Sequence, residues 1–438
     1  MPYSWLTWAE AQAELSLRLS DTAQEFTVAA EVPLYLTLAM QRWNCLTGFW
    51  VVEYPLTLTP PFAANWFQAN GSGSPRLQTQ TDLSLYTLMQ YMLLEPPSGG
   101  GAWAGTPQFN LAMLSQAVQG RRDESLQVGA SNMVEVSLTI PANASRVTLP
   151  DNALDVRRVR YVPVTGSSVT LERGDAESFR TFTPSYLQST VQPLRYDVIS
   201  GPPLALTLDS GVPVPGVLQT LIMEAEAVPS PPSATALGIP DDYAWVPLFG
   251  ALADLLSSQE ESLDQPRAKY CLERYTEGLE LLRQAPWLLE ARVNGVAVAT
   301  TSAIAADRFN VNWQTNAAAF PQLVTAGTDL FAVSPVPTAT ASVVLVVVGN
   351  APIPVSGSVE IQVPRDVMDA ILDEAEHLAQ FKRGGAEFMA SMSLHKSFMD
   401  TAKRWDTRGR MEGIFPTTLR SDQPREDAQQ PRFSGGNK

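Results

Sequence analysis

The sequence contains very little histidine and cysteine for its length. Only 2 histidines and 2 cysteines occur in 438 residues. Zinc sites and most acid–base catalytic sites need several such side chains close together, so the composition excludes most of them. Cys45 and Cys271 both lie in apolar helical patterns, and free cysteine is often a small buried hydrophobe. We therefore expect two buried free thiols and no disulfide.

The two histidines lie in helical patterns near the C-terminus. His395 falls on an apolar face between Met392 and Met399. No second ligand stands at metal-binding spacing, which favours a hydrogen-bonded core or interface histidine over a metal ligand or general base. His377 follows Asp373 by about one helical turn, and this spacing predicts an ordinary side-chain pair rather than a catalytic dyad.

Motifs for catalysis and nucleotide binding are also missing. The chain has no Walker loop, no G-x-G-x-x-G after a strand and no G-x-S-x-G, the patterns that cradle phosphates or present a nucleophile. The glycine-rich stretch SGGGAWAG lacks the lysine of a phosphate loop, so we expect an ordinary loop there. Adjacent carboxylates such as Asp241 and Asp242 point in different directions on a helix. We predict no enzymatic activity, no catalytic residues, and no bound metal or cofactor.

Basic residues are fewer than acidic ones, and long apolar runs are missing. The chain has 30 Lys and Arg against 45 Asp and Glu, a net charge of −15, which disfavours wrapping nucleic acid. The longest aliphatic run, 341–348, is far below the ~20 residues of a membrane helix. The N-terminus lacks the basic and apolar regions of a secretory signal. We expect no membrane association, no sequence-specific nucleic-acid binding, and synthesis in a reducing cytoplasm.

What the chain does contain is typical of a folded protein of two or three domains. Hydrophobic residues make up 45% and charged residues 17%, with 34 prolines and 27 glycines, which favours strands and turns interrupted by helices. The predicted fold class is α+β, with helical hairpin blocks alternating with antiparallel β-sandwich or barrel-like blocks. The predicted regions are a mostly helical 1–130, a β-rich block and linker 131–237, a central helical hairpin 238–290, a second β-rich block 291–363, a C-terminal helical hairpin 364–405 and an extended arm 406–438.

Several local signals support these boundaries. Thr7 and Glu10 have the spacing of a capping box, which predicts a helix from Trp8 to about residue 26. Gly48 should end the next helix, and Thr81 or Asp82 should open another. Asn294-Gly295 between apolar runs predicts a tight β-hairpin.

The central hairpin has two apolar stripes at helical spacing. The first stripe runs from Trp245 through Phe249 to Leu256, and the second runs from Cys271 through Tyr275 to Leu282. Stripes of this kind pack against each other. The residues that we predict to make packing or oligomer contacts are Trp245, Phe249, Tyr275, Phe388 and His395.

A short motif recurs before both hairpins. Ile239-Pro-Asp-Asp242 and Val363-Pro-Arg-Asp366 lie 124 residues apart, and each follows a strand-like block and precedes a helical hairpin. The repetition suggests an internal duplication of a strand block with its hairpin.

The order of these blocks, with three particular stretches, resembles tailed-phage virion proteins of the head-to-tail adaptor, or neck, type. The stretches are LGIPDDYAWVPLFGALADLL at 237–256, RAKYCLERYTEGL at 267–279 and EHLAQFKRGGAEF at 376–388. The resemblance implies a homo-oligomeric ring, commonly dodecameric, between the portal protein and the tail or nozzle proteins. It also implies helices around a channel, β-domains or arms that reach neighbours, and double-stranded DNA only as passing cargo.

The sequence therefore predicts a non-enzymatic structural subunit of a phage virion, assembled in the host cytoplasm. A receptor-binding or glycan-binding tail appendage is the alternative, because the β-rich blocks could form a recognition surface. Such an appendage would bind its ligand as an isolated chain, typically as a trimer. The sequence supports the connector better, because many large apolar residues and an acidic balance suit a subunit that is buried against copies of itself.

Overall fold

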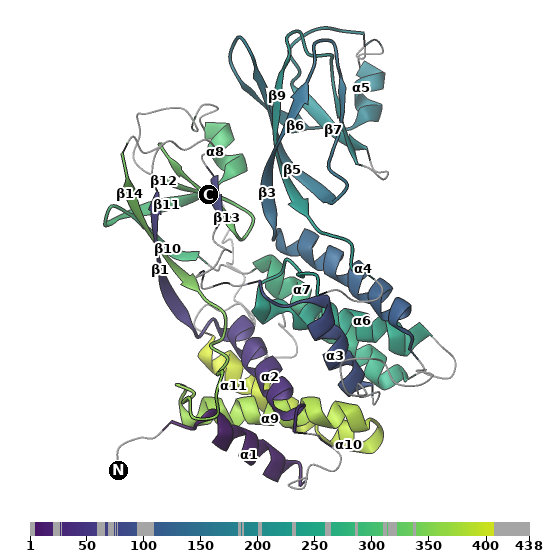
Figure 1. Ribbon diagram of the computed structural model, residues 1–438, viewed down its shortest axis with the longest axis vertical. Helices are drawn as coiled ribbons and strands as arrows, with labels where there is room; N and C mark the ends of the chain where they lie inside the picture. The colour runs from purple at the N-terminus through teal and green to yellow at the C-terminus, as the bar shows by residue number, and fades with distance from the viewer. Residues whose placement is uncertain are drawn as a thin grey trace, which may run out of the picture.

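The structure is a computed structural model. It describes residues 5–20, 27, 29–58, 66–68, 74, 76, 78–93, 109–182, 185, 188–199, 204–229, 234–258, 264–284, 288–309, 313, 322–335 and 339–406. The fold class is α+β, as predicted, with two barrel-like sheets. Helices gather at one end of the molecule, and two β-domains project side by side from them (Figure 1).

The helical body contains most of the helices and one continuous apolar core. Its members come from both ends and from the middle of the chain. They are α1 (Trp8–Arg18), α2 (Val32–Thr47), α3 (Asp82–Met92), α4 (Leu111–Gly129), α6 (Trp245–Ser258), α7 (Gln265–Gln284), α9 (Arg365–Arg383), α10 (Gly385–Ala390) and α11 (Met392–Trp405), with a short 3₁₀ turn η1 (Asp241–Tyr243) before α6.

The inner β-domain is continuous in sequence. Its strands are β3 (Met133–Ile140), β4 (Arg146–Thr148), β5 (Ala153–Pro163), β6 (Val169–Arg173), β7 (Arg195–Ile199), β8 (Ala205–Leu208) and β9 (Gly216–Glu224), with α5 (Ala176–Phe182) between β6 and β7. The strand order is β3-β9-β5-β6-β7-β8-β4. The strands enclose an apolar core of their own.

The outer β-domain is assembled from two distant parts of the chain. Its strands are β1 (Val51–Leu58), β2 (Trp66–Gln68), β10 (Leu288–Val293), β11 (Val296–Ser302), β12 (Gln322–Ala326), β13 (Leu330–Ser334) and β14 (Ala341–Val348), with α8 (Ala303–Phe309) between β11 and β12. The strand order is β1-β14-β10-β11-β12-β13-β2. A second separate apolar core fills it.

The two β-domains share one topology. When the strands of each domain are ranked in chain order, both sheets read first, seventh, third, fourth, fifth, sixth, second. Each has one parallel pair, β6–β7 or β11–β12, joined through a short helix. Two helices precede and at least two follow the strands of each set. The chain is thus two copies of one unit, and the inner copy (α3 to α7) is inserted between β2 and β10 of the outer copy.

This nesting refines several expectations. The repeated motif does mark equivalent points, because Pro240 caps η1 and Pro364 caps α9 after the last strand of each copy. Residues 1–130, expected as one mostly helical region, contain β1 and β2 of the outer β-domain. Each sheet is mixed rather than purely antiparallel, since a helix crossover makes one pair parallel.

Helix boundaries also differ in places. α1 ends at Arg18 instead of extending to residue 26, which lies outside the described residues. The C-terminal hairpin has three helices, because Gly384 adopts a φ of 65° and breaks the chain between α9 and α10. The SGGGAWAG stretch and residues 407–438 of the arm also lie outside the described residues.

Most of the local signals are confirmed. Thr7 and Glu10 form the capping box, and Thr81 caps α3. Gly48 ends α2 in the left-handed conformation. Asn294 and Gly295 form the turn between β10 and β11, with φ values of 51° and 80°. Both cysteines are free and buried. No helix in the described part of the chain is long and apolar enough to span a membrane.

Candidate functional site

The five predicted contact residues all lie inside the helical body. Trp245 and Phe249 on α6, Tyr275 on α7, Phe388 on α10 and His395 on α11 are buried. The rings of Trp245 and Phe249 pack edge to face with centroids 6.2 Å apart. Their role in this chain is packing between helices, because buried side chains offer no surface to a neighbouring subunit.

α6 is the centre of this packing. Nearly every residue of α6 is buried, because α4 and α7 both pack along it. α7 approaches closely at Gly278, where an added Cβ would lie 2.6 Å from the Val246 side chain. The two stripes of the central hairpin therefore meet as the sequence predicted, with a glycine at the contact.

A buried ionic network lies beside these aromatic residues. Arg42 of α2 forms ion pairs with Glu374 of α9 and, at 3.3 Å, with Glu277 of α7. Arg274 contacts Glu277 at 2.9 Å and the Nε2 atom of His395 at 2.6 Å. His395 Nδ1 lies 2.8 Å from Glu374. The network joins α2, α9 and α11 of the outer copy to α7 of the inner copy.

Burial sets the protonation states in this network. It lowers the pKa of His395, which outweighs the opposing charge of Glu374. Burial alone would raise the pKa of Glu374, but the charge of Arg42 and the contact with His395 hold it well below its ordinary value. A neutral His395 can donate from Nδ1 to Glu374 and accept at Nε2 from Arg274. Two arginines and two carboxylates balance, so we assign the network to structure.

His377 does not form the pair that the sequence predicted with Asp373. It is fully buried, with Nδ1 2.8 Å from the Ser391 hydroxyl and Nε2 3.0 Å from the Tyr270 hydroxyl. Asp373 instead accepts a hydrogen bond from Arg18 of α1 at 2.8 Å. The helix turns the two side chains toward different neighbours. Burial lowers the pKa of His377 to about 3, so it stays neutral.

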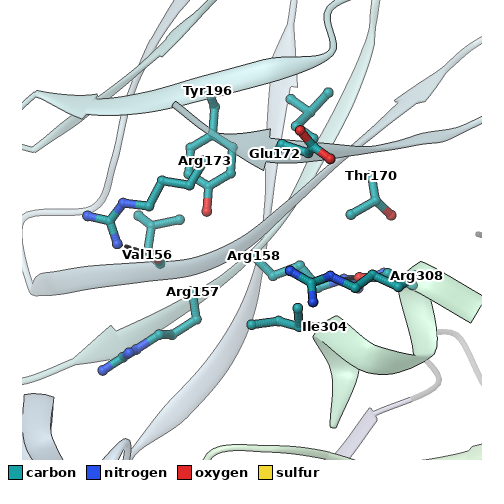
Figure 2. A pocket seen from close by; sticks show the side chains of 11 residues that line it. Val156, Arg157, Arg158, Thr170, Glu172, Arg173, Tyr196, Ile304 and Arg308 are labelled. Atoms are coloured by element: carbon teal, nitrogen blue, oxygen red, sulfur yellow. Dashed lines mark hydrogen bonds and ion pairs between the residues drawn. The ribbon is translucent and has the colours of Figure 1, made fainter. Parts of the chain in front are cut away.

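The most site-like feature of the molecule lies elsewhere, between the two β-domains. A cleft of about 800 Å³ opens between β5, β6 and β7 of the inner β-domain and α8 of the outer one (Figure 2). We call it the arginine cleft, after four of its lining residues. It is lined by Val156, Arg157, Arg158, Thr170, Leu171, Glu172, Arg173, Tyr196, Ile304, Asp307 and Arg308.

One arginine closes the bottom of the cleft. Arg158 is only 4% exposed and donates two hydrogen bonds to Asp307 of α8, at 2.5 and 2.6 Å. Trp313 donates to the same carboxylate at 2.8 Å, and the Arg158 guanidinium stacks over its ring. Two parallel hydrogen bonds to one carboxylate hold a guanidinium group in one orientation. This contact fixes the two walls of the cleft relative to each other.

The other three arginines are available at the cleft surface. Arg157 and Arg173 are about half exposed and share one carboxylate, Asp155, each at 3.4 Å. Arg157 also donates to the Gln127 carbonyl at 2.7 Å, and Arg173 donates to the Val156 carbonyl at 3.5 Å. Arg308 is exposed and has no ion pair or hydrogen bond with any of the described residues. The three side chains belong to β5, β6 and α8 (Figure 2). Their charge is only partly compensated within the chain.

A tyrosine completes the cleft. Tyr196 of β7 is only 2% exposed, yet its hydroxyl has no hydrogen-bond partner among the residues that the structure describes. Figure 2 shows the ring extending into the cleft with the hydroxyl toward the arginine side chains. Burial raises the pKa of Tyr196 to about 12, against the opposing charge of Arg173. The hydroxyl is therefore protonated and can donate a hydrogen bond.

A second hollow, of about 740 Å³, lies between α1 and the start of α9. Its main polar groups are already paired. Glu10 belongs to the capping box with Thr7, and Glu14 accepts a hydrogen bond from Arg365 at 2.7 Å. The arginine cleft is the stronger candidate, because Arg157 and Arg173 share a single carboxylate and Arg308 has no ion pair or hydrogen bond with any of the described residues.

Reasoning from sequence missed the arginine cleft. The run VRRVRYVPV was interpreted only as a strand, although Arg157 and Arg158 are its first two arginines. No group of three or more His, Cys, Asp or Glu side chains in the described part of the chain could hold a metal ion. The sequence matches no protein-family profile and none of the curated proteins with which it was compared.

Proposed function

We propose that this chain is a non-enzymatic structural subunit of a phage virion. In this proposal, copies of the chain form a ring-shaped head-to-tail adaptor between the portal protein and the tail or nozzle proteins, and DNA passes through the ring. The observation that carries the proposal is the separation of the helical body from the two β-domains (Figure 1). It suits the arrangement implied by the resemblance, with helices around a channel and β-domains reaching neighbours.

The nested duplication supports such a role. A ring subunit needs two different faces that meet on neighbouring copies, and it must hold them at a fixed angle. Here the helices of both copies share one apolar core, and the Arg42 network crosses between them. The Arg158–Asp307 contact also joins the β-domains. The net charge of −15 suits a channel wall that DNA passes without tight binding.

Exposed apolar side chains on all three parts of the molecule supply contact surface for neighbours. Phe309 at the end of α8 is 90% exposed, and Val355 before α9 is 99% exposed. Others lie on the inner β-domain and on the helices: Leu17, Val164, Val191, Leu194, Leu272 and Met389. Single exposed apolar residues are common, so their contribution must be measured.

The test is the mass and shape of the purified full-length protein, by native mass spectrometry and negative-stain electron microscopy. We expect closed rings of about twelve copies, either alone or on addition of the portal protein of the same phage. Phe309→Ser and Val355→Ser should reduce the ring fraction without changing the melting temperature of the subunit. A monomer that never joins a portal would refute the proposal. A trimer that binds a glycan would support the tail-appendage alternative.

A further inference from the structure

We propose that the arginine cleft is a docking site for a carboxylate-bearing segment of a partner protein. This inference does not depend on the ring, because it rests on the chemistry of the cleft alone. The partner segment would place acidic side chains against Arg157, Arg173 and Arg308 and one carboxylate oxygen against the Tyr196 hydroxyl.

The first argument is charge. The whole chain has a net charge of −15, yet four arginines line this one cleft against three carboxylates, Asp307 and Glu172 in its lining and Asp155 beside it. Asp307 already accepts hydrogen bonds from Arg158 and Trp313. The exposed guanidinium groups therefore produce a local positive potential on an otherwise acidic molecule, and such a potential attracts anionic ligands.

The second argument is the set of donors. A guanidinium offers two parallel N–H groups that match a carboxylate. The Tyr196 hydroxyl adds a protonated donor that has no hydrogen-bond partner among the described residues. An acceptor that enters the cleft can take this hydrogen bond. The arginines and Tyr196 come from four different elements and line one cleft.

The third argument separates a peptide from nucleic acid. The cleft wall includes the exposed apolar side chain of Ile304, with Val156 and Leu171 of the domain core beneath it. An exposed apolar side chain beside arginines suits a peptide that alternates acidic and apolar residues. A volume of about 800 Å³ has room for a few residues only. A long phosphate backbone would leave the cleft at both ends and meet an acidic surface, because the net charge is −15.

The experiment is calorimetric titration of the full-length protein with the acetylated peptide GELELEG, which carries three glutamates. The matched probe is GQLQLQG, and the competing classes are inorganic phosphate and a short DNA duplex. We expect the acidic peptide to bind with an affinity that falls as salt rises, and the glutamine peptide not to bind. Binding of phosphate or DNA without binding of the acidic peptide would overturn the proposal, as would no binding of any probe at millimolar concentration.

Three variants test the assignment of residues. Arg173→Gln with Arg308→Gln should weaken peptide binding by about tenfold or more, since two charged donors are lost. Tyr196→Phe keeps the ring but removes the hydroxyl, and should weaken binding by about fivefold. Arg146→Gln on β4, outside the cleft, is the control and should bind as the parent does. Equal affinity in all variants with unchanged melting temperatures would place the peptide elsewhere and refute the proposal.

Ring formation is scored separately, so the two proposals can fail independently. Rings that form normally but bind no acidic peptide would refute the docking site alone. A monomer that binds the acidic peptide through the cleft would refute the ring alone.

Discussion

The two β-domains have the same strand order but very different surfaces. Each has its own apolar core, and those cores contain mainly aliphatic residues in both domains. The inner β-domain contributes Arg157, Arg158 and Arg173 to the lining of the cleft. The outer β-domain contributes α8, which carries Asp307. Topology depends on the pattern of buried positions, while exposed positions are free to change. The duplication has therefore kept a fold and produced two complementary walls.

Two turns of the outer β-domain differ in what surrounds them. Asn294-Gly295 is a two-residue turn at the end of the β10–β11 hairpin, and an added Cβ at Gly295 would meet open space. The β12–β13 turn instead touches the inner copy, where Thr328 donates to the Ala130 carbonyl at 3.1 Å. The Asp329 side chain accepts from the Met133 amide at 3.4 Å. The first turn contacts Ser342 of its own domain through Asn294, whereas the second turn contacts the inner copy.

The largest effect should come from the ionic contact that joins the helices of the two copies. Arg42→Met would leave the buried Glu374 with only its contact to neutral His395, and Glu277 with only Arg274, and breaking a buried pair costs about 3 to 5 kcal/mol. We expect a much lower melting temperature and two separated unfolding transitions in calorimetry, because the copies would lose a shared element.

Arg18→Met is the matched control for this prediction. Arg18 also bridges helices, through Glu14, Asp369 and Asp373, but its side chain is 25% exposed. Partly exposed pairs contribute about 1 kcal/mol or less. If both substitutions lower the melting temperature equally, the buried network does not hold the copies together.

The second-largest loss of stability should come from the contact between the β12–β13 turn and the inner copy. An added Cβ at Gly327 would lie 2.1 Å from the Ala130 carbonyl oxygen, and the residue has a φ of 67°. Gly327→Ala should therefore cost about 3 kcal/mol, by displacement of the turn and by backbone strain. Gly295→Ala, with a φ of 80° but open space, should cost only about 1 kcal/mol. Urea denaturation of both variants checks this, and equal losses would show that this contact is not closely packed.

The same contact predicts a dependence on pH. Burial raises the pKa of Asp329 to about 7, although the hydrogen bond from the Met133 amide opposes this. The folded state then holds a proton that the unfolded state releases near its ordinary value of 3.8. The stabilisation is complete below about pH 4 and is lost as pH rises through 7.

Asp329→Asn removes this titration. Relative to the parent, the variant should gain up to about 1.4 kcal/mol of unfolding free energy per pH unit between pH 5 and 7. Denaturation curves at three pH values measure this, and Asp151→Asn at an exposed position of the inner domain is the control. A difference between Asp329→Asn and the parent that stays constant with pH would show that Asp329 is ionised in the folded state throughout.

Sequence alone predicted the features that depend on neighbouring residues. The α6 and α7 stripes, the Thr7 capping box and the Asn294-Gly295 turn all have short-range patterns, and the structure confirms them. The nesting was not predicted, because β1 pairs with β14 across most of the chain. No periodicity marks a pair that is so distant in sequence.

The arginine cleft was missed for a related reason. Arg158 and Asp307 are 149 residues apart, and each alone looks like an ordinary surface charge. Arg42 was missed as well, since charged residues are rarely buried unless paired and its partners come from distant helices. Of the candidate site, only the clustering of arginines in VRRVR could have been noticed.

The smallest loss of stability should come from breaking the Arg158–Asp307 contact between the two β-domains. Arg158→Gln removes both hydrogen bonds to Asp307, which keeps its bond from Trp313. We expect a loss of about 1 to 2 kcal/mol, because one charged group loses one of its partners. Hydrogen exchange should become faster in α8, which packs against the inner domain through this pair.

Arg158→Lys separates charge from geometry at this contact. Lysine keeps the positive charge but cannot donate two parallel hydrogen bonds. If the paired hydrogen bonds of Arg158 hold the two β-domains in place, amide hydrogen exchange in α8 should be as fast in Arg158→Lys as in Arg158→Gln. The melting temperature of Arg158→Lys should stay closer to that of the parent. Exchange in α8 that matches the parent in both variants would mean that apolar contacts, such as Met133 and Leu221 with Ala303 and Ala306, hold the β-domains together without this ion pair.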